Sequence, residues 1–297
     1  MHSSSENREF MRSSVRSSLL FSSSSSSSSS RRGHAARRLL STYYDSQSGL
    51  HVSRVDGPRL HEIGPASAPD LLPLAASARL PSVALAAASA SSQAESLLTA
   101  GVSPFLHAGR DTASWADHLE TSAELGLGLS LEVSCGATPE LDVRLASDRA
   151  VSSAVALLET AAERSVPVRV GLLDALLPGA ARVELLACKL ADAGADVITL
   201  VCPADDAACG DDDELEEILE GLVGSDVLGT PMADRVGLRT MCGDDGVAAC
   251  ERALALGVKH FDTSLSGGAA GPPHPATLAR LLEEHGHAHG VDLDRLS

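Results

Sequence analysis

Aromatic residues make up only 2% of the 297 residues, and lysine occurs only twice, as Lys189 and Lys259. No apolar run approaches the ~18–20 residues that a membrane-spanning helix needs. Lysine and arginine together number 23 against 40 acidic residues, and the formal net charge is −17. Nucleic-acid binding depends on clustered basic side chains. We therefore expect neither a membrane-spanning protein nor a general nucleic-acid binder.

Cysteine is present but not in the arrangements that define a cysteine-rich protein. No CxxC pair occurs, and residues 1–47 hold no apolar stretch long enough for the core of a secretory signal. Both facts argue against a disulfide framework and against a structural zinc site. The sequence predicts thiols at positions 135, 188, 202, 209, 242 and 250.

The first 47 residues differ in composition from the remainder. They hold seven arginines against three acidic residues, a charge of +4, and nine consecutive serines at 22–30, whereas the remainder carries −21. A Ser-rich, Arg-rich and acid-poor segment is typical of an organelle transit peptide. We expect residues 1–47 to be a disordered transit peptide for the mitochondrial matrix, with a plastid as the alternative destination. A low-complexity tail without any address is the other interpretation.

From residue 58 onward, short β-prone runs alternate with Ala- and Leu-rich stretches of helical spacing, among them 150–164 and 181–193. Alternation of this kind implies right-handed βαβ units, and eight of them favour one closed (β/α)8 TIM barrel over residues 58–297. An open doubly wound sheet is the alternative. Its glycine fingerprint is missing, because Gly126 and Gly128 precede a strand and do not begin a helix. The predicted strands are 60–63, 82–86, 104–107, 129–133, 167–172, 197–201, 236–241 and 260–263.

Several collinear segments resemble the hydroxymethylglutaryl-CoA lyase family. They are Leu60–Pro65, Ala253–Val258, Phe261–Ser264, Gly267-Gly268 and Gly290–Leu293. The resemblance implies an aldolase-type (β/α)8 barrel that cleaves 3-hydroxy-3-methylglutaryl-CoA to acetyl-CoA and acetoacetate. It also implies a divalent cation, Mg or Mn, that chelates the oxygens of the substrate.

The functional positions that the resemblance implies are altered in this chain. Ala66 and Ser67 stand where the family has an arginine and a metal-binding aspartate. Residues 238–245 contain no histidine where the family has two, and Gly271 replaces the loop cysteine. The resemblance therefore predicts that no catalytic or metal-binding residue is retained. We expect no cofactor, and Mg or Mn only if the family mechanism survives.

Other side chains at the ends of the predicted strands offer a replacement site, because barrel active sites lie at the strand C-termini. A Cys–His nucleophile pair is one interpretation. Buried cysteines acting as small hydrophobes beside a hydrogen-bonded histidine are the other. Arg110, Arg235 and Arg239 are considered as phosphate contacts on this face, although a solvated surface position is favoured for each. The candidates at the barrel mouth are His107, Cys202, Cys242, Asp244, Asp262 and Ser264.

Taken together, the residues predict a lyase-like protein without lyase activity. The alternative is an active carbon-carbon lyase, or another acyl-CoA or oxo-acid enzyme of the same superfamily, with altered site chemistry. An acyl-CoA or a small organic acid is the expected ligand. A second copy of the chain or a related subunit is left open as a protein partner.

Overall fold

The computed structural model describes residues 58–63, 71–136, 141–176, 179–202, 212–227, 229–266 and 271–296; the side chains of 141–147, 212, 244 and 245 are outside this description. The predicted N-terminal extension also lies outside it. No helix in the described part of the chain is both long and apolar enough to cross a bilayer.

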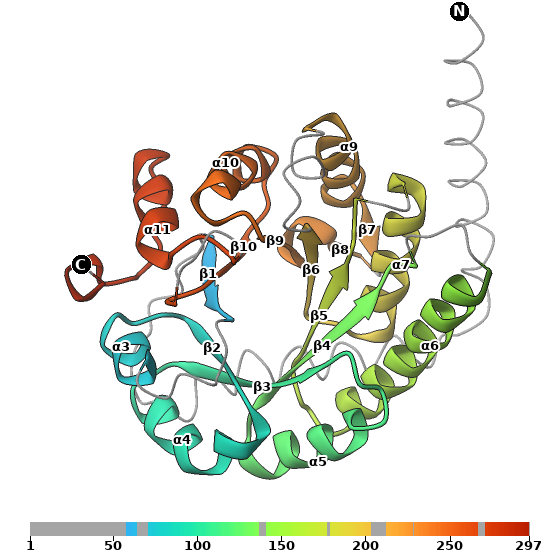
Figure 1. Ribbon diagram of the computed structural model, residues 1–297, viewed down its shortest axis with the longest axis horizontal. Helices are drawn as coiled ribbons and strands as arrows, with labels where there is room; N and C mark the ends of the chain where they lie inside the picture. The colour runs from blue at the N-terminus through green and yellow to red at the C-terminus, as the bar shows by residue number, and fades with distance from the viewer. Residues whose placement is uncertain are drawn as a thin grey trace, which may run out of the picture.

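Eight parallel strands close into a barrel in the order β1-β10-β9-β6-β5-β4-β3-β2 (Figure 1). All eight predicted strands are confirmed, with boundaries that differ by at most two residues. The barrel strands are β1 (Arg59–Glu62), β2 (Ser82–Leu85), β3 (Ser103–Gly109), β4 (Gly128–Ser134), β5 (Val168–Leu173), β6 (Val197–Cys202), β9 (Val236–Thr240) and β10 (His260–Thr263).

A ring of helices surrounds the barrel (Figure 1). Left-handed glycines end two of them, Gly126 after α5 and Gly194 after α7, because a residue without Cβ adopts a positive φ at little cost. The helices are α3 (Leu72–Ser77), α4 (Ala87–Thr99), α5 (Trp115–Leu125), α6 (Leu141–Glu163), α7 (Ala180–Ala193), α9 (Asp212–Val223), α10 (Val247–Ala255) and α11 (Pro275–Glu284).

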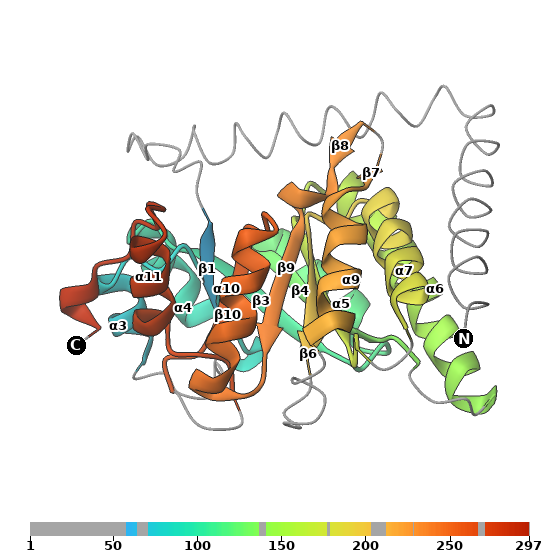
Figure 2. The same cartoon turned by 90° about the horizontal axis from the view of Figure 1, so that it is seen from above.

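Short elements complete the barrel. A small antiparallel hairpin, β7 (Asp226–Val227) and β8 (Thr230–Pro231), follows α9 and stands out at one end of the barrel (Figure 2). The 3-10 turns are η2 (Met232–Asp234), η3 (Gly243–Gly246) and η4 (Leu293–Arg295). The turn η2 leads directly into β9.

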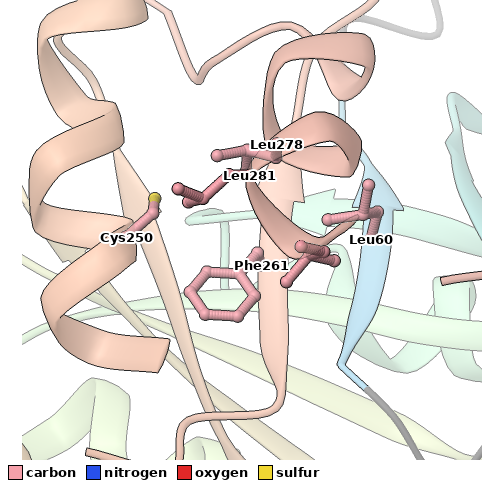
Figure 3. A pocket seen from close by; sticks show the side chains of 6 residues that line it. Leu60, Cys250, Phe261, Leu278 and Leu281 are labelled. Carbon is pink, nitrogen blue, oxygen red and sulfur yellow. The ribbon is translucent and has the colours of Figure 1, made fainter. Parts of the chain in front are cut away.

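The apolar core lies between the strands and the helices. Leu60 of β1 and Phe261 of β10 point outward and pack against Leu278 and Leu281 of α11 and Cys250 of α10 (Figure 3). The gap among these side chains is too narrow to hold a water molecule. It is therefore part of the packing between barrel and helices, and the search for a site turns to the inner faces of the strands.

Side chains alternate between the two faces of a strand, so residues next to these outward-facing positions point into the barrel. Most barrels of this kind fill their interior with branched aliphatic side chains. This barrel instead buries His61, Arg169, Arg239, His260 and Asp262. Charged and polar groups inside a barrel need partners, and those partners define the candidate site.

Candidate functional site

Asp262 of β10 lies at the centre of the polar interior and is 1% exposed. Its Oδ1 accepts a hydrogen bond from Arg169 Nη2 of β5 at 2.5 Å, and its Oδ2 accepts one from Arg239 Nε of β9 at 2.9 Å. Burial alone would raise the pKa of Asp262. Attraction to the two guanidinium groups and their hydrogen bonds outweigh burial and lower that pKa below its ordinary value.

Arg239 extends the cluster toward the barrel mouth. Its Nη1 donates to Glu132 Oε1 of β4 at 2.6 Å, and Arg110 Nε lies 3.9 Å from the other oxygen of Glu132. Burial would lower the pKa of Arg239, but Asp262 and Glu132 raise it, so this guanidinium stays charged. The side chain of Arg110 is 70% exposed at the outer end of the network.

Arg169 is held on several sides. Its guanidinium lies 5.7 Å from the centre of the Phe105 ring, within the range of a cation–π contact, and Nη2 also reaches Thr199 Oγ1 at 3.4 Å. Its Nε is buried and has no hydrogen-bond partner among the described residues. We call Arg169, Asp262, Arg239 and Glu132 the arginine–carboxylate network. Its four formal charges balance.

Sequence reasoning places Asp262 and Glu132 at strand ends on this face and considers Arg239 there as a phosphate contact, but it misses Arg169 and the pairing of the four. The favoured surface position of Arg239 is wrong, because this residue is only 7% exposed. The prediction that places Arg235 on the mouth face is also wrong. This residue precedes β9 at the opposite end of the barrel and donates to the carbonyl groups of Ala191 and Ala195. A usable signal was present: an arginine inside an apolar parallel strand must face the barrel interior and find a carboxylate there.

His107 of β3 lies in register beside Ser130 of β4, which in turn pairs with Arg169. The residue is exposed at the mouth, yet the barrel walls shield its ring enough to lower its pKa, an effect that Glu132 partly opposes. The imidazole is consequently neutral at pH 7. Among the predicted mouth residues, Asp262 also acts on His107, because its carboxylate raises the pKa of that ring slightly.

The two predicted cysteines are both buried. Cys202 ends β6 and belongs to the apolar core, 1% exposed, and strand alternation places it on the helix side because Thr199 faces inward. Cys242 follows β9 and is 5% exposed. The alternation separates the Cys202 thiol from the barrel face on which His107 lies.

The remaining predicted residues lie near the β10 end. Ser264 is 3% exposed, and its hydroxyl is 2.7 Å from that of Ser266. Asp244 lies in η3, and its side chain is outside the description. Glu62 was not predicted as a site residue, but its Oε2 accepts from the backbone N–H of Leu265 at 2.8 Å. That carboxylate therefore anchors the start of the loop after β10.

The donor set among the described residues does not fit the divalent cation that the family resemblance implies. No group of three or more His, Cys, Asp or Glu side chains suited to a metal occurs in the described parts of the chain. Asp262 and Glu132 already accept hydrogen bonds from guanidinium groups. Arg239 lies within the stretch where the resemblance implies imidazole ligands. A divalent cation there would face two fixed positive charges.

No protein-family model and no curated protein sequence matches this chain. Among solved structures, an HMG-CoA lyase from Brucella melitensis superposes with a TM-score of 0.60 at 16% identity, covering 81% of this chain and 95% of the lyase. The likeness establishes the barrel fold.

The carboxyl transferase domain of Rhizobium etli pyruvate carboxylase, crystallised with 3-bromopyruvate, gives a TM-score of 0.56 at 14% identity. The match covers 88% of this chain and 49% of that one. This second likeness also concerns the fold. The match spans about half the length of that carboxyl transferase domain chain.

Proposed function

We propose that this chain is a hydroxymethylglutaryl-CoA-lyase-like barrel that does not carry out the lyase reaction. One observation carries the proposal: Arg169 and Arg239 occupy both oxygens of the buried Asp262 carboxylate, and Arg239 also binds Glu132. The family reaction depends on a divalent cation at the barrel mouth. Here guanidinium groups supply the positive charge and use the lone pairs that a cation would need.

The energetics favour keeping this arrangement. Removing a guanidinium from a buried carboxylate leaves an uncompensated charge, which costs about 3–5 kcal/mol. A cation entering beside Arg239 would also meet repulsion that is strong in a low-dielectric interior. A guanidinium cannot chelate the substrate's hydroxyl and carboxylate oxygens as a metal does, so the enolate would form without a Lewis acid.

The test is a direct assay of the full chain. Acetoacetate release should stay at background with saturating 3-hydroxy-3-methylglutaryl-CoA and excess Mg or Mn, while a known lyase run in parallel is active. Isothermal titration should show no stoichiometric binding of either metal. Turnover in the ordinary enzyme range of about 1–1000 per second, or one tightly bound cation per chain, would overturn the proposal.

A second candidate function is an enzyme of the same superfamily with altered chemistry. His107 favours it, because a neutral imidazole at the mouth can accept a proton, and the exposed guanidinium of Arg110 nearby can bind a carboxylate. The ligand would be an acyl-CoA or a small organic acid. Thermal-shift measurements with such acids should show stabilisation that Arg110→Gln removes. Lack of any shift across acyl-CoAs and oxo acids would reject this candidate.

The mitochondrial matrix is the proposed location, with a plastid as the alternative. The support is the composition of residues 1–47, in which seven arginines and a serine run accompany only three acids. A fluorescent fusion to these residues should enter mitochondria, and one to residues 48–297 should not. A cytosolic signal from the first fusion would contradict the proposal.

A second copy of the chain or a related subunit remains the proposed protein partner. The support is general: most soluble oligomers are homo-oligomers with closed symmetry. Light scattering of the purified chain decides the matter: a mass near 30.5 kDa indicates a monomer and argues against self-association.

A further inference from the structure

A chain of side-chain hydrogen bonds lies at the base of the barrel, where His260 is the next inward-facing residue of β10 before Asp262. Ser82 Oγ is 2.5 Å from His61 Nδ1, and His61 Nε2 is 2.9 Å from His260 Nδ1. His260 Nε2 is 3.1 Å from the backbone carbonyl oxygen of Asp234. The two imidazole rings are nearly parallel, with centroids 5.2 Å apart and an angle of 18° between their planes. We call this chain the histidine seam.

The hydrogen positions in the seam follow from its last partner. A carbonyl oxygen only accepts, so His260 Nε2 must carry its hydrogen, and in a neutral ring His260 Nδ1 is then an acceptor. His61 Nε2 therefore donates to it, which leaves His61 Nδ1 to accept from the Ser82 hydroxyl. Every contact is satisfied in one arrangement, and in that arrangement both rings are neutral.

The seam bridges the two pairs of neighbouring barrel strands that have the fewest paired residues. Strands β1 and β2 pair through two positions, His61 with Ser82 and Glu62 with Val83. Strands β10 and β9 also pair through two positions. By contrast, β4 and β5 pair through six. The seam joins β2, β1, β10 and the turn η2 before β9, so it reinforces the strands that have the fewest backbone hydrogen bonds to the rest.

The surroundings of the seam disfavour a positive charge on either ring. Burial is the main cause that lowers the pKa of both histidines, to about 4 for His260, and Arg169 is the next. Arg59 acts in the same direction on both, and Asp262 opposes the shift only for His260.

The carboxylate of Asp234 is engaged away from the rings. Asp234 faces His260 with its backbone carbonyl, while its carboxylate binds Lys259 Nζ at 2.5 Å. Ser82, His61 and His260 are 3%, 6% and 7% exposed. Such burial suits a joint between strands and leaves a substrate no approach to the serine hydroxyl.

We propose that the histidine seam is a pH-sensitive closure of the barrel, which acid opens at β1 and β10 before the rest of the barrel unfolds. A proton added at His260 Nδ1 takes the lone pair that accepts from His61, and two N–H groups then face each other. A proton added at His61 Nδ1 instead makes the Ser82 hydroxyl an acceptor and keeps that contact, but it buries a positive charge that Arg169 repels. Either event destabilises the closed seam, and the rings of an open form gain water as a partner.

Hydrogen exchange measured by mass spectrometry on the full chain tests the closure. Protection factors, corrected for intrinsic exchange, are compared from about pH 7 to about pH 5. In this range the histidines of an open form bind protons, whereas those of the closed form stay neutral. Amides of β1 and β10 should lose about tenfold in protection per pH unit for each histidine that the open form protonates. Amides of β4 and β5 should change much less.

Variants separate the seam from other acid effects. A glutamine side chain both donates and accepts hydrogen bonds without titrating. The double variant His61→Gln/His260→Gln should therefore flatten the pH dependence of amide protection in β1 and β10. His287→Gln removes an exposed histidine elsewhere and should leave that dependence intact. If the double variant does not fold, NMR of the imidazole groups in the unmodified chain replaces it. The rings of His61 and His260 should then stay neutral down to the pH at which the β1 and β10 amides begin to exchange.

Three outcomes would overturn the proposal. The first is an equal loss of protection in all strands between pH 7 and pH 5. The second is protonation of both buried rings without selective exchange at β1 and β10. The third is an unchanged pH dependence of exchange at β1 and β10 in the double variant. None of these outcomes depends on whether the barrel has lyase activity.

Discussion

Arg239 donates its Nε to Asp262 Oδ2 at 2.9 Å between two neighbouring strands, and both side chains are more than nine-tenths buried. The pair lies where a barrel of this fold ordinarily packs branched aliphatic side chains. Charges removed from water need strong partners, and here the partners are supplied from strands that are far apart in the sequence. The centre of the barrel is therefore held by charge pairing.

Asp262→Asn should lower the free energy of unfolding by about 3–5 kcal/mol, because it leaves Arg169 and Arg239 facing each other without the carboxylate between them. Urea denaturation followed by circular dichroism measures the change. Lys259→Gln is the matched control, since it breaks an ion pair with Asp234 whose side chains are about half exposed. That pair should contribute less than about 1 kcal/mol. Equal effects of the two substitutions would contradict a structural role of the network.

Stability should fall as the pH is lowered from 6.5 toward 4. The pKa of folded His260 is about 4, whereas an unfolded histidine takes up its proton near 6.5. The unfolded chain binds more protons in this window, so acid favours unfolding, and the contribution of His260 is fully present only above pH 6.5. The loss from His260 alone is about 3 kcal/mol at pH 4.

Urea titrations at a series of pH values measure this slope. His61 and His107, whose pKa values are also lowered, add to it in the same direction. Asp262 does not add to this slope. Its pKa is lowered in the folded protein, so its protonation reduces the stability of the fold only at pH below 3.8. His260→Gln should reduce the slope between pH 6.5 and 4, and an unchanged slope would show that this ring is not the titrating group.

Gly128→Ala should destabilise the barrel by about 1–3 kcal/mol, because the new methyl group would overlap the Phe105 ring that lies beside Arg169. Thermal unfolding measures the effect. Gly171→Ala is the control on the next strand, where a Cβ would meet its nearest atoms at 3.5–3.6 Å, an ordinary contact. Similar unfolding temperatures for the two variants would show that the ring moves aside freely.

Cys135 should resist alkylation in the folded protein. Burial, and then Asp174, raises the pKa of its thiol to about 12, although Arg182 partly opposes the shift. At pH 8 only about one thiol in ten thousand is then the reactive thiolate. Peptide mass spectrometry after iodoacetamide treatment should find Cys135 modified only in denaturant. Cys188, which is less buried, should react earlier. Equal rates at Cys135 in folded and denatured protein would contradict this.

Several elements could be derived from local pattern alone. The β-prone run at 197–201 and the helical spacing of 181–193 each carry their own signal, and both elements form with ends within one residue of the prediction. Helix α6 was less predictable, since it begins at Leu141, nine residues before the expected start at 150. Helix ends depend on packing and capping as well as on the apolar repeat.

The site was harder to derive because its parts are distant in the sequence. Arg169 and Asp262 are separated by 93 residues, and His61 and His260 by 199. Nothing in the local sequence of β1 indicates that its histidine will meet the last strand. Only closure of the barrel, with β1 beside β10, brings the two rings together.

The sequence by itself determined the eightfold alternation of strands and helices, the barrel that follows from it, and the contrast between an Arg-rich first segment and an acidic remainder. These properties depend on neighbouring residues and on composition, and both are present in the linear chain. Tertiary structure alone decided that Arg169, Arg239, Glu132 and Asp262 form one balanced network and that two histidines close the base of the barrel. Such pairings depend on strand register and on which face each side chain takes, and a shift of one residue would turn every inward group outward.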